Sequence, residues 1–301
     1  MTFMKKGPML ASSEILPMPE VTWPKLGSFK FDGLRQSIGD EHKPYTRSLL
    51  QLPNNYAREV ITEAKLPVGL DGELGCLDCN GVMQFKKSMS ALTSEDGEPE
   101  FRFYIFDNYN YDGAFLSRLE SIQAMKLPEW CVIADQRDLN STEEAMAMYR
   151  ESLDLGHEGL ILRDPLGPYK FGRATSKSQW ALKMKPKRTA EAEIVAVEQK
   201  MKNTNARERD ARGHAKRSGA LIGKVPVEAV GMLVCRWVPG QAGLEYTGTF
   251  GVGGGWDADE AKAWWLHSPV GQIATLEFAE TGGYEKPRHA QFKGFRHMAD
   301  L

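Results

Sequence analysis

Residues 27–37 read GSFKFDGLRQS and place Lys30 between two phenylalanines. Asp32, Gly33 and Arg35 follow within five residues. If the stretch is a strand, Lys30 and Asp32 point to the same face, where the carboxylate favours the charged form of the amine. A lysine is nucleophilic only when neutral, and nearby positive charge favours that form. The stretch is therefore either a solvated strand edge or half of a reactive site whose other half is cationic.

A second segment can supply that positive charge. Residues 180–186 read WALKMKP, and in a strand Lys183 and Lys185 share one face while the apolar residues occupy the other. Two neighbouring ammonium groups suit a polyphosphate. Taken alone, the segment fits an amphipathic strand with solvated lysines equally well.

Two glutamates lie beside glycines in strand-like segments. Glu73 stands in LDGELG and Glu158 in GHEGLILR. The glycines allow a ligand to approach closely, and a carboxylate among lysines can hold Mg²⁺. Either glutamate alone is more typical of a turn, so a site is indicated only by the combination with the lysines.

The composition is that of a soluble globular protein of one large or two medium domains. The chain has 301 residues, of which 42% are hydrophobic and 26% are charged, with a formal net charge of −2. We find no apolar run of about 18 residues and no secretory signal, so we expect a cytoplasmic protein. Cys76 and Cys79 have no second pair at zinc-site spacing, which predicts reduced cysteines without a metal.

A change in pattern near Pro186 predicts two domains, 1–185 and 186–301. The first part mixes strand-like runs with a helix over 141–156, where Ser141 and Glu144 have the spacing of a capping box. The second has short strands around one helix near 257–265, a pattern that suits a small barrel such as an OB-fold. We therefore predict an α+β fold.

The second part contains a strongly basic segment, residues 200–217. It has seven basic residues against Glu208 and Asp210, with almost nothing apolar to bury, which predicts a flexible loop. The loop is either simply solvated or ordered by phosphates. Its basic residues are Lys200, Lys202, Arg207, Arg209, Arg212, Lys216 and Arg217.

Together these segments resemble the ATP-dependent DNA ligases, members of the covalent nucleotidyltransferases. The family's lysine-x-aspartate-glycine-x-arginine signature is complete at residues 30–35. The later motifs follow in order along the chain. They supply Arg47, Glu73, Phe106 with Asp107, Glu158, Lys183 and Lys185, and finally Arg288, Phe292, Arg296 and Asp300 in PRHAQFKGFRHMAD.

The resemblance implies a nucleotidyltransferase domain (ATP-grasp-like adenylation) over 1–185 and a C-terminal OB-fold β-barrel over 186–301. It also implies ATP as cofactor, with AMP bound covalently to Lys30, and Mg²⁺ or Mn²⁺. The expected reaction seals a 5′-phosphate/3′-hydroxyl nick through a lysine-AMP intermediate and a DNA-adenylate. Enzymes of this kind serve DNA replication, repair and recombination.

The resemblance also implies roles for the residues around the nucleotide. Lys30 would be the nucleophile, Lys183 and Lys185 would face the α-phosphate, and Glu158 with Asp32 would hold the metal. The remaining nucleotide contacts would come from Ser28 at adenine, Phe106 stacked on adenine, Arg35 and Glu73 at the ribose, and Arg288 and Arg296 at pyrophosphate. The chain departs from many ligases around Asp300, which leaves the role of that residue open.

For DNA, the resemblance implies that Arg47 contacts phosphate and that residues 200–217 close around the duplex. The expected partner is nicked duplex DNA, bound by a monomer with no membrane attachment. Two alternatives stay open. One is an RNA ligase or a capping guanylyltransferase of the same superfamily, and the other is a nucleic-acid-binding protein with an inactive enzyme domain.

Overall fold

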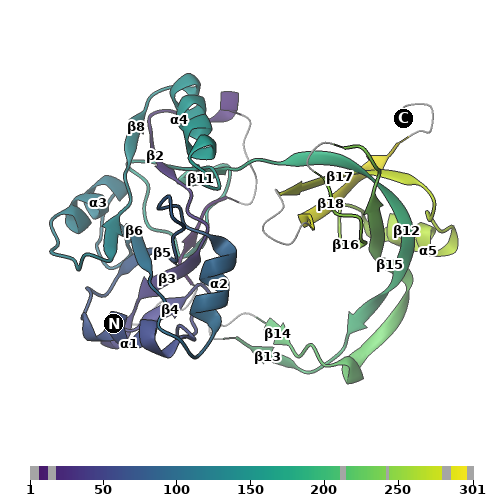
Figure 1. The fold of residues 1–301 in the computed structure, drawn as a ribbon, viewed down its shortest axis with the longest axis horizontal. Coiled ribbons are helices and arrows are strands. Elements are labelled where there is room, and N and C mark those ends of the chain that lie inside the picture. The colour runs from purple at the N-terminus through teal and green to yellow at the C-terminus, as the bar shows by residue number, and fades with distance from the viewer. Residues whose placement is uncertain (1–6, 13–17, 211–214, 242–243, 280–285, 297–301) are drawn as a thin grey trace. The chain divides into compact units, whose positions relative to one another are not determined.

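The computed structural model describes residues 7–12, 18–210, 215–241, 244–279 and 286–296 (Figure 1). Contacts within the chain divide it into two compact units. Unit 1 takes in the described residues of Met1–Lys185 and Arg209–His214, and unit 2 those of Pro186–Glu208 and Ala215–Leu301. Helices and strands alternate in unit 1 and strands dominate unit 2, so the chain is α+β.

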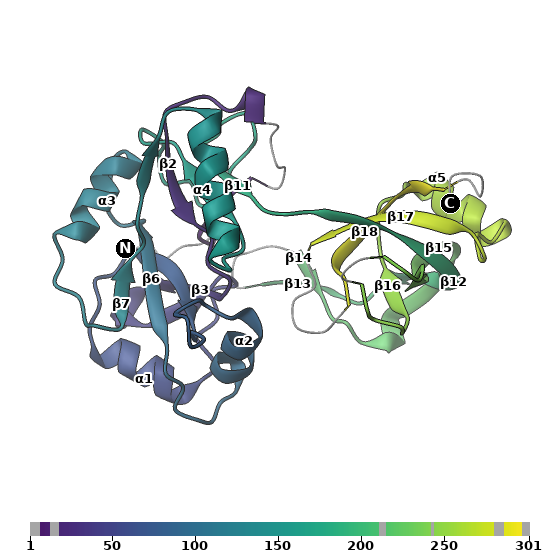
Figure 2. The same ribbon diagram turned by 45° about the horizontal axis from the view of Figure 1, so that its top comes forward.

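Unit 1 is built on two sheets (Figure 2). The first is antiparallel, in the order β11 (Ala181–Met184), β9 (Leu160–Arg163), β2 (Lys25–Phe29), β8 (Arg137–Leu139). The second has the order β4 (Pro44–Thr46), β3 (Leu34–Ile38), β5 (Leu70–Gly75), β6 (Arg102–Asn108), β7 (Cys131–Ile133), with β7 parallel to β6. A short parallel pair joins β1 (Met9–Leu10) to β10 (Gly172–Arg173).

Helices cover the sheets of unit 1 and close its two larger hydrophobic cores. They are α1 (Asn55–Glu63), α2 (Phe85–Thr93), α3 (Phe115–Gln123) and α4 (Thr142–Asp154), with short 3₁₀ turns η1 (Met18–Glu20) and η2 (Asp40–His42). One core joins the β3–β5–β6 region to α1 and α2 through residues such as Ile61, Leu74 and Leu92. The other joins β9 and β11 to α4 through residues such as Met148 and Leu162.

The helix predicted over 141–156 is confirmed as α4, and its start is set by capping. The hydroxyl of Ser141 accepts a hydrogen bond from the backbone N–H of Glu144 at 3.2 Å, which satisfies a free donor of the first turn. The second hydrogen bond of the predicted capping box is displaced by one residue. The Glu144 carboxylate accepts from the N–H of Asn140 at 2.7 Å rather than from that of Ser141.

Unit 2 is a five-stranded antiparallel sheet around its own core. The strand order is β16 (Phe250–Val252), β15 (Lys224–Trp237), β12 (Arg188–Asn203), β17 (Ile273–Ala279), β18 (Arg288–Phe295). Its inward side chains include Ile194, Leu233, Leu276 and Phe292. The predicted helix is confirmed as α5 (Ala258–Leu266), which Asp257 and Glu260 begin with a capping box.

The expectation of a closed barrel in unit 2 is not confirmed by the described residues. β16 and β18 lie at the two edges of the strand order, and no ladder joins them there. They approach where the N–H of Phe292 donates to the carbonyl of Gly254 at 2.9 Å, just past β16. β16 is only three residues long, so it offers little edge for closure.

The prediction of a flexible loop over 200–217 was also wrong in part. Residues Lys200–Asn203 are the end of β12 and pair with Lys224–Val227 of β15. Beyond them β13 (Arg207–Arg209) and β14 (Ala215–Arg217) form a two-stranded sheet, followed by the turn η3 (Leu221–Gly223). Pairing between the strands satisfies their backbone N–H and C=O groups, so the strands form without an apolar face. The loop prediction depended on the lack of apolar residues, which does not exclude such strands.

Candidate active site

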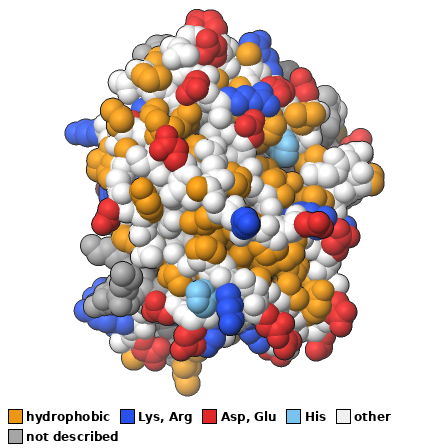
Figure 3. All heavy atoms as spheres, turned by 90° about the vertical axis from the view of Figure 1, so that its left-hand side faces the viewer, with side chains coloured by type: hydrophobic (Ala, Val, Ile, Leu, Met, Phe, Trp, Pro, Cys, Tyr) orange, Lys and Arg blue, Asp and Glu red, His pale blue; other side chains and the backbone are white. Residues whose placement is uncertain are grey.

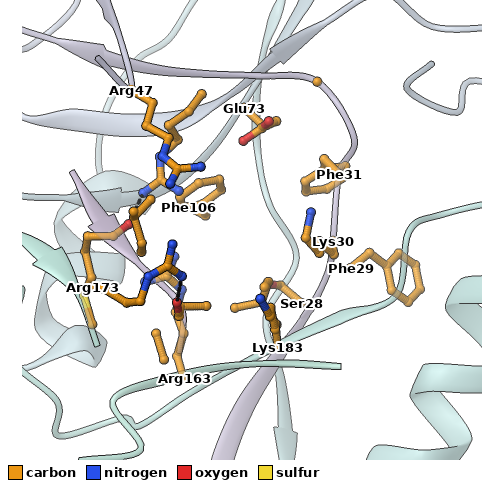
Figure 4. A pocket seen from close by; sticks show the side chains of 17 residues that line it. Ser28, Phe29, Lys30, Phe31, Arg47, Glu73, Phe106, Arg163, Arg173 and Lys183 are labelled. Carbon is orange, nitrogen blue, oxygen red and sulfur yellow. Dashed lines mark hydrogen bonds between the residues drawn. The ribbon is translucent and has the colours of Figure 1, made fainter. Parts of the chain in front are cut away.

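A cavity of about 300 Å³ opens in unit 1 beside Lys30 (Figure 4). Its walls come from the first sheet, from the second sheet and from the β1–β10 pair. Seven residues expected at the site line it: Ser28, Lys30, Arg35, Arg47, Glu73, Phe106 and Lys183. The fold therefore brings together side chains that are up to 155 positions apart in the sequence.

Strand register explains how these residues meet. Ser28 on β2 and Lys183 on β11 both pair with Ile161 on β9, so the three lie in a row across adjacent strands. Arg35 on β3 pairs directly with Glu73 on β5. Residues opposite each other in a ladder share a face, and the two rows thus face the cavity from two sheets.

Lys30 does not lie in a strand, so the expectation that it shares a strand face with Asp32 was wrong. β2 ends at Phe29, and residues 30–33 form the connection to β3. The backbone of Lys30 still bonds to the neighbouring chain: its N–H donates to the Gly159 carbonyl at 2.8 Å, and its carbonyl accepts from the N–H of Glu158 at 3.1 Å. These two bonds hold Lys30 against the segment that carries Glu158.

Glu158 is shared by two lysines. Its carboxylate accepts from Lys30 Nζ through one oxygen and from Lys185 Nζ through the other, the second at 2.7 Å. Burial alone would raise the pKa of Glu158, but these two ammonium groups outweigh it and hold the pKa below the ordinary value. Glu158 is therefore ionised at neutral pH and links Lys30 to Lys185 of the cationic segment.

Two glycines allow this close packing. Gly159 has φ of +131°, and a Cβ there would clash with the Met184 carbonyl on β11. At Gly33 a Cβ would clash with the side chain of Met83 and the Leu74 carbonyl. Only glycine fits either position without displacing backbone, which is why the signature and the EGL segment each need one.

Lys183 and Lys185 end up in different surroundings. Lys183 lines the cavity, where burial, followed by the nearby Arg173 and Lys185, lowers its pKa. Lys185 lies just past β11 and is bonded to Glu158. Lys183 therefore presents positive charge to the cavity, while Lys185 is linked to Lys30 through the shared carboxylate of Glu158.

Glu73 is an acidic group with an unusual protonation equilibrium. Burial raises its pKa to about 7, against the opposing charges of Arg35 and Lys30 and with help from Asp32 and Glu158. Near neutral pH its carboxyl group can therefore either donate or accept a hydrogen bond, as a ribose hydroxyl would require.

Arg35 is held by a buried carboxylate beneath the cavity floor. Its Nε and Nη2 donate to the two oxygens of Asp71 at 2.7 and 2.6 Å, and Nη2 also donates to the Met9 carbonyl at 3.0 Å. The guanidinium lies 4.5 Å from the centre of the Phe106 ring, and that of Arg163 lies 5.1 Å from it. Stacking of this ring on adenine stays a prediction.

The sequence analysis named Asp107 as part of a motif but missed the charged layer to which it belongs. Asp107, fully buried, accepts from Arg118 Nε at 2.7 Å and from Arg163 Nη1 at 3.0 Å, and Tyr169 donates to Asp71 at 2.5 Å. Period two along β5 places Asp71 on the face of Glu73, which was a usable signal. Arg118 and Tyr169 reach the layer only through the fold, so no local pattern could identify them.

Arg173 was also missed, although it lines the cavity. Its Nη1 donates to the Ala11 carbonyl at 2.9 Å. Figure 4 shows Arg47, Arg163 and Arg173 on one side of the cavity and Lys30 with Lys183 on the other. A ligand between them would meet cations on both sides, which suits a phosphate chain.

The carboxylates fit a metal that arrives with phosphates. No cluster of three or more His, Cys, Asp or Glu side chains able to hold an ion occurs in the described part of the chain. Mg²⁺ commonly takes one or two carboxylates, with substrate phosphates and water completing its shell. Glu158 and Asp32 suit that kind of site, whereas the four cysteines are free thiols.

The expected contacts of unit 2 are only partly described. Arg288 begins β18, and Arg296 follows it with Nε 2.5 Å from Glu191 Oε1. Asp300 and Arg212 lie outside the described residues. The other basic residues of the 200–217 segment are exposed: Lys200, Lys202, Arg207, Arg209, Lys216 and Arg217. Their contacts with nucleotide or DNA stay predictions.

One face of unit 1 contrasts with that segment. Figure 3 shows it with hydrophobic side chains gathered centrally and with acidic and basic side chains interspersed around them. Such a mixed surface is ordinary for a folded domain. In the described residues, no helix has the length and apolar character needed to cross a membrane.

Comparison with curated proteins points to one family. The chain is 30% identical over 213 residues to a probable DNA ligase of Mycobacterium marinum and 28% identical over 211 residues to one of Rhodococcus opacus. Each alignment covers 64% of this chain but only 41% and 40% of the relative. The chain therefore matches about two fifths of the length of these proteins.

Solved structures share the fold. A Lig E DNA ligase matches with a TM-score of 0.70 at 23% identity, covering 96% of this chain and 99% of that one. The Chlorella virus DNA ligase-adenylate matches with a TM-score of 0.53 at 24% identity, covering 96% and 99%. At the level of sequence, residues 8–185 match the model of the ATP-dependent DNA ligase domain. The chain belongs to the ATP-dependent DNA ligase domain family.

Proposed function

We propose that this protein is an ATP-dependent DNA ligase that seals nicks in duplex DNA. The observation that carries the proposal is the Lys30–Glu158–Lys185 bridge beside a cavity with cations on both sides. A lysine is nucleophilic only when neutral, and the cations around the cavity favour that form, while Glu158 fixes the position of the Lys30 amine. Membership of the family supplies the reaction class.

In the first step the neutral amine of Lys30 attacks the α-phosphorus of ATP. An N–P bond forms, the bond between the α-phosphorus and the bridging oxygen breaks, and pyrophosphate leaves. The proton lost by the amine goes to solvent or to Glu158, which already accepts a hydrogen bond from Lys30. AMP then passes to a 5′-phosphate, and the 3′-hydroxyl of the nick displaces it to form the phosphodiester bond.

The residues of the cavity would divide the work as follows. Lys183 stabilises the charge that develops on the α-phosphate, and Lys185 holds Glu158 in place. Arg35 and Glu73, opposite each other on β3 and β5, orient the ribose, while Ser28 and Phe106 meet the adenine. A bound Mg²⁺ or Mn²⁺, held by Glu158 and Asp32, would neutralise phosphate charge.

DNA contacts would come from both units. Arg47 lines the cavity and would meet the 5′-phosphate of the nick, and the exposed cations of residues 200–217 would neutralise backbone phosphates. We assign 1–185 as the adenylation domain and 186–301 as an OB-fold-like domain whose Arg288 and Arg296 assist pyrophosphate. We propose that the protein acts as a monomer in the cytoplasm, where its DNA and ATP are found.

Labelling and sealing assays test the proposal. Incubation with α-labelled ATP and Mg²⁺ should give a protein adduct that survives denaturing electrophoresis, and a 5′-phosphorylated nick in DNA should then be sealed. Labelling by GTP and not by ATP would instead indicate a guanylyltransferase. Sealing of RNA strands alone would indicate an RNA ligase, and no adduct from either nucleotide would leave an inactive nucleic-acid-binding protein.

A further inference from the structure

A cluster of aromatic rings borders the backbone of Lys30. Phe29 and Phe31 flank Lys30 in the sequence, and Figure 4 shows both rings beside it. His157 immediately precedes Glu158, whose carboxylate accepts from the Lys30 amine. The ring of His157 stacks on that of Phe29 with a centroid distance of 4.8 Å and meets that of Phe31 edge-on at 5.7 Å. The residue before Glu158 therefore packs against both neighbours of Lys30.

The cluster also reaches the second sheet and a helix. The ring of Phe31 stacks on that of Tyr104 on β6 at 4.2 Å, with the two ring planes 26° apart. The backbone N–H of His157 donates to the Ser152 carbonyl of α4 at 2.8 Å. Both contacts tie the segment around Lys30 to regular elements of unit 1.

The same rings line a second cavity, of about 230 Å³. Its described lining includes Phe29, Phe31, Tyr104 and His157. Phe29 and Phe31 also line the cavity beside Lys30, whereas the described lining of that first cavity includes neither Tyr104 nor His157. A substitution of His157 therefore changes the packing around Lys30 and keeps the walls of the cavity in which we propose that the nucleotide binds.

The imidazole of His157 is suited to packing. The residue is half-buried, and burial lowers the pKa of its ring. The ring is therefore neutral at neutral pH and can stack on phenylalanine as another aromatic ring does.

Backbone bonds alone do not fix the direction of the Lys30 side chain. The Lys30 N–H donates to the Gly159 carbonyl, and the Glu158 N–H donates to the Lys30 carbonyl. Both bonds are made by one residue of the connection 30–33, so they define an axis about which that connection can still turn. Rings packed on both flanks of Lys30 oppose such a turn.

We propose that His157 is a positioning residue for adduct formation, because its ring, packed on Phe29 and Phe31, holds the Lys30 side chain in line with the α-phosphorus. An attacking group must lie close to the reacting atom and point toward it, and loss of that alignment slows the reaction. This inference rests on the proposed function, which supplies the reaction.

Single-turnover adduct formation tests the inference. The rate would be measured with α-labelled ATP and Mg²⁺ over a range of ATP concentrations, for the parent protein and for His157→Ala. We expect the maximal rate of the variant to fall by about tenfold to a hundredfold, since small misplacements of a reacting group cost up to about that much. The ATP concentration at half the maximal rate should stay within about threefold of the parent value, because the interactions lost belong to the transition state.

His157→Phe should restore the reaction. It keeps a flat ring on Phe29 and Phe31, and the second cavity has room for the larger side chain. Its maximal rate should lie within about threefold of the parent rate, because packing and not proton transfer by the imidazole is responsible. His157→Leu fills the space without a flat ring and should be as slow as His157→Ala. It replaces that variant if urea titration shows His157→Ala to be unfolded.

His42→Ala is the matched control. His42 is also half-buried in unit 1, and its Nδ1 lies 2.8 Å from the carbonyl oxygen of Leu66. The same substitution there removes a bonded imidazole from η2. This variant should lose some stability in urea titration but form the adduct at the parent rate.

Four results would overturn the inference. They are a parent-like maximal rate in the variants that lack a ring, an equal loss in His157→Phe, an effect only on the ATP concentration at half the maximal rate, and an equal slowing by His42→Ala. A parent protein that forms no adduct would refute the proposed function and this inference with it, whereas the four results leave the proposed function standing.

Discussion

Glu158 fixes the position of the Lys30 amine, which donates a hydrogen bond to its carboxylate. One carboxylate serves two ammonium groups and stays ionised between them, so displacement of Lys30 from it frees the amine without leaving the glutamate uncompensated. Beneath this bridge, Asp71 and Asp107 anchor the arginines of the cavity floor. The side chains that line the cavity are thus supported by two buried carboxylates that do not themselves line it.

Substituting Asp71 by Asn should destabilise unit 1 strongly. In the parent protein two nitrogens of the Arg35 guanidinium donate to Asp71. The substitution removes the buried negative charge that balances this guanidinium. We expect a loss of about 3–5 kcal/mol in the free energy of unfolding, measured by urea titration. Asp135→Asn is the control, because that carboxyl group is 75% exposed and its ion pair should contribute under about 1 kcal/mol. Equal effects of the two substitutions would contradict the role given to Asp71.

Glu73 should make stability fall as pH rises through the neutral range. Its pKa is about 7 when folded against 4.5 as the ordinary value, so between these pH values the native state holds a proton that the unfolded chain has released. Raising the pH through this window therefore lowers the free energy of unfolding, by up to about 3 kcal/mol in total.

Glu73→Gln should remove that part of the pH dependence, because glutamine does not titrate. Urea midpoints of both proteins at pH 5 and pH 8 measure it. If the variant keeps the full difference between the two pH values, the titration belongs to another group.

At the scale of elements, the segment that leads into β9 fixes the position of Glu158. Gly159→Ala should cut adduct formation far more than it cuts stability, since a Cβ there meets the Met184 carbonyl and would push Glu158 away from Lys185. We expect at least a hundredfold slower adduct formation, because small misplacements of catalytic groups cost about that much.

Gly172→Ala is the matched control for this effect. Gly172 also has positive φ, +89°, but no atom lies within 4 Å of the position that its Cβ would take. It should cost about 1 kcal/mol of stability with near-normal adduct formation. If both glycine variants slow the reaction equally, backbone strain rather than displacement of Glu158 is responsible.

The strongly basic segment, residues 200–217, should bind DNA through charge. Lys200→Glu/Lys202→Glu should weaken binding to nicked duplex and reduce the slope of log affinity against log salt by about 2, one unit for each lost phosphate contact. Adduct formation with ATP should stay unchanged, because it needs no DNA. Lys262→Glu/Lys286→Glu changes the net charge equally elsewhere in unit 2 and should leave the slope close to that of the parent protein.

For the whole molecule, much of unit 1 could be predicted because its signals are local. Residues 30–35 and the alternation in WALKMKP identify residues that the fold does bring to one cavity. The two-stranded form of β13 and β14 could not be predicted, since it depends on backbone pairing rather than on apolar side chains. Arg163 and Arg173 were missed because their place at the cavity depends on pairing with β2, β11 and β1.

The central claim is that Lys30 carries AMP covalently, and one measurement tests it most directly. The protein would be incubated with ATP and Mg²⁺, digested, and searched by mass spectrometry for AMP-bearing peptides. We predict that AMP is found on Lys30 and that Lys30→Ala forms no adduct and seals no nick. AMP on any other residue, or an adduct that persists in Lys30→Ala, would contradict the account.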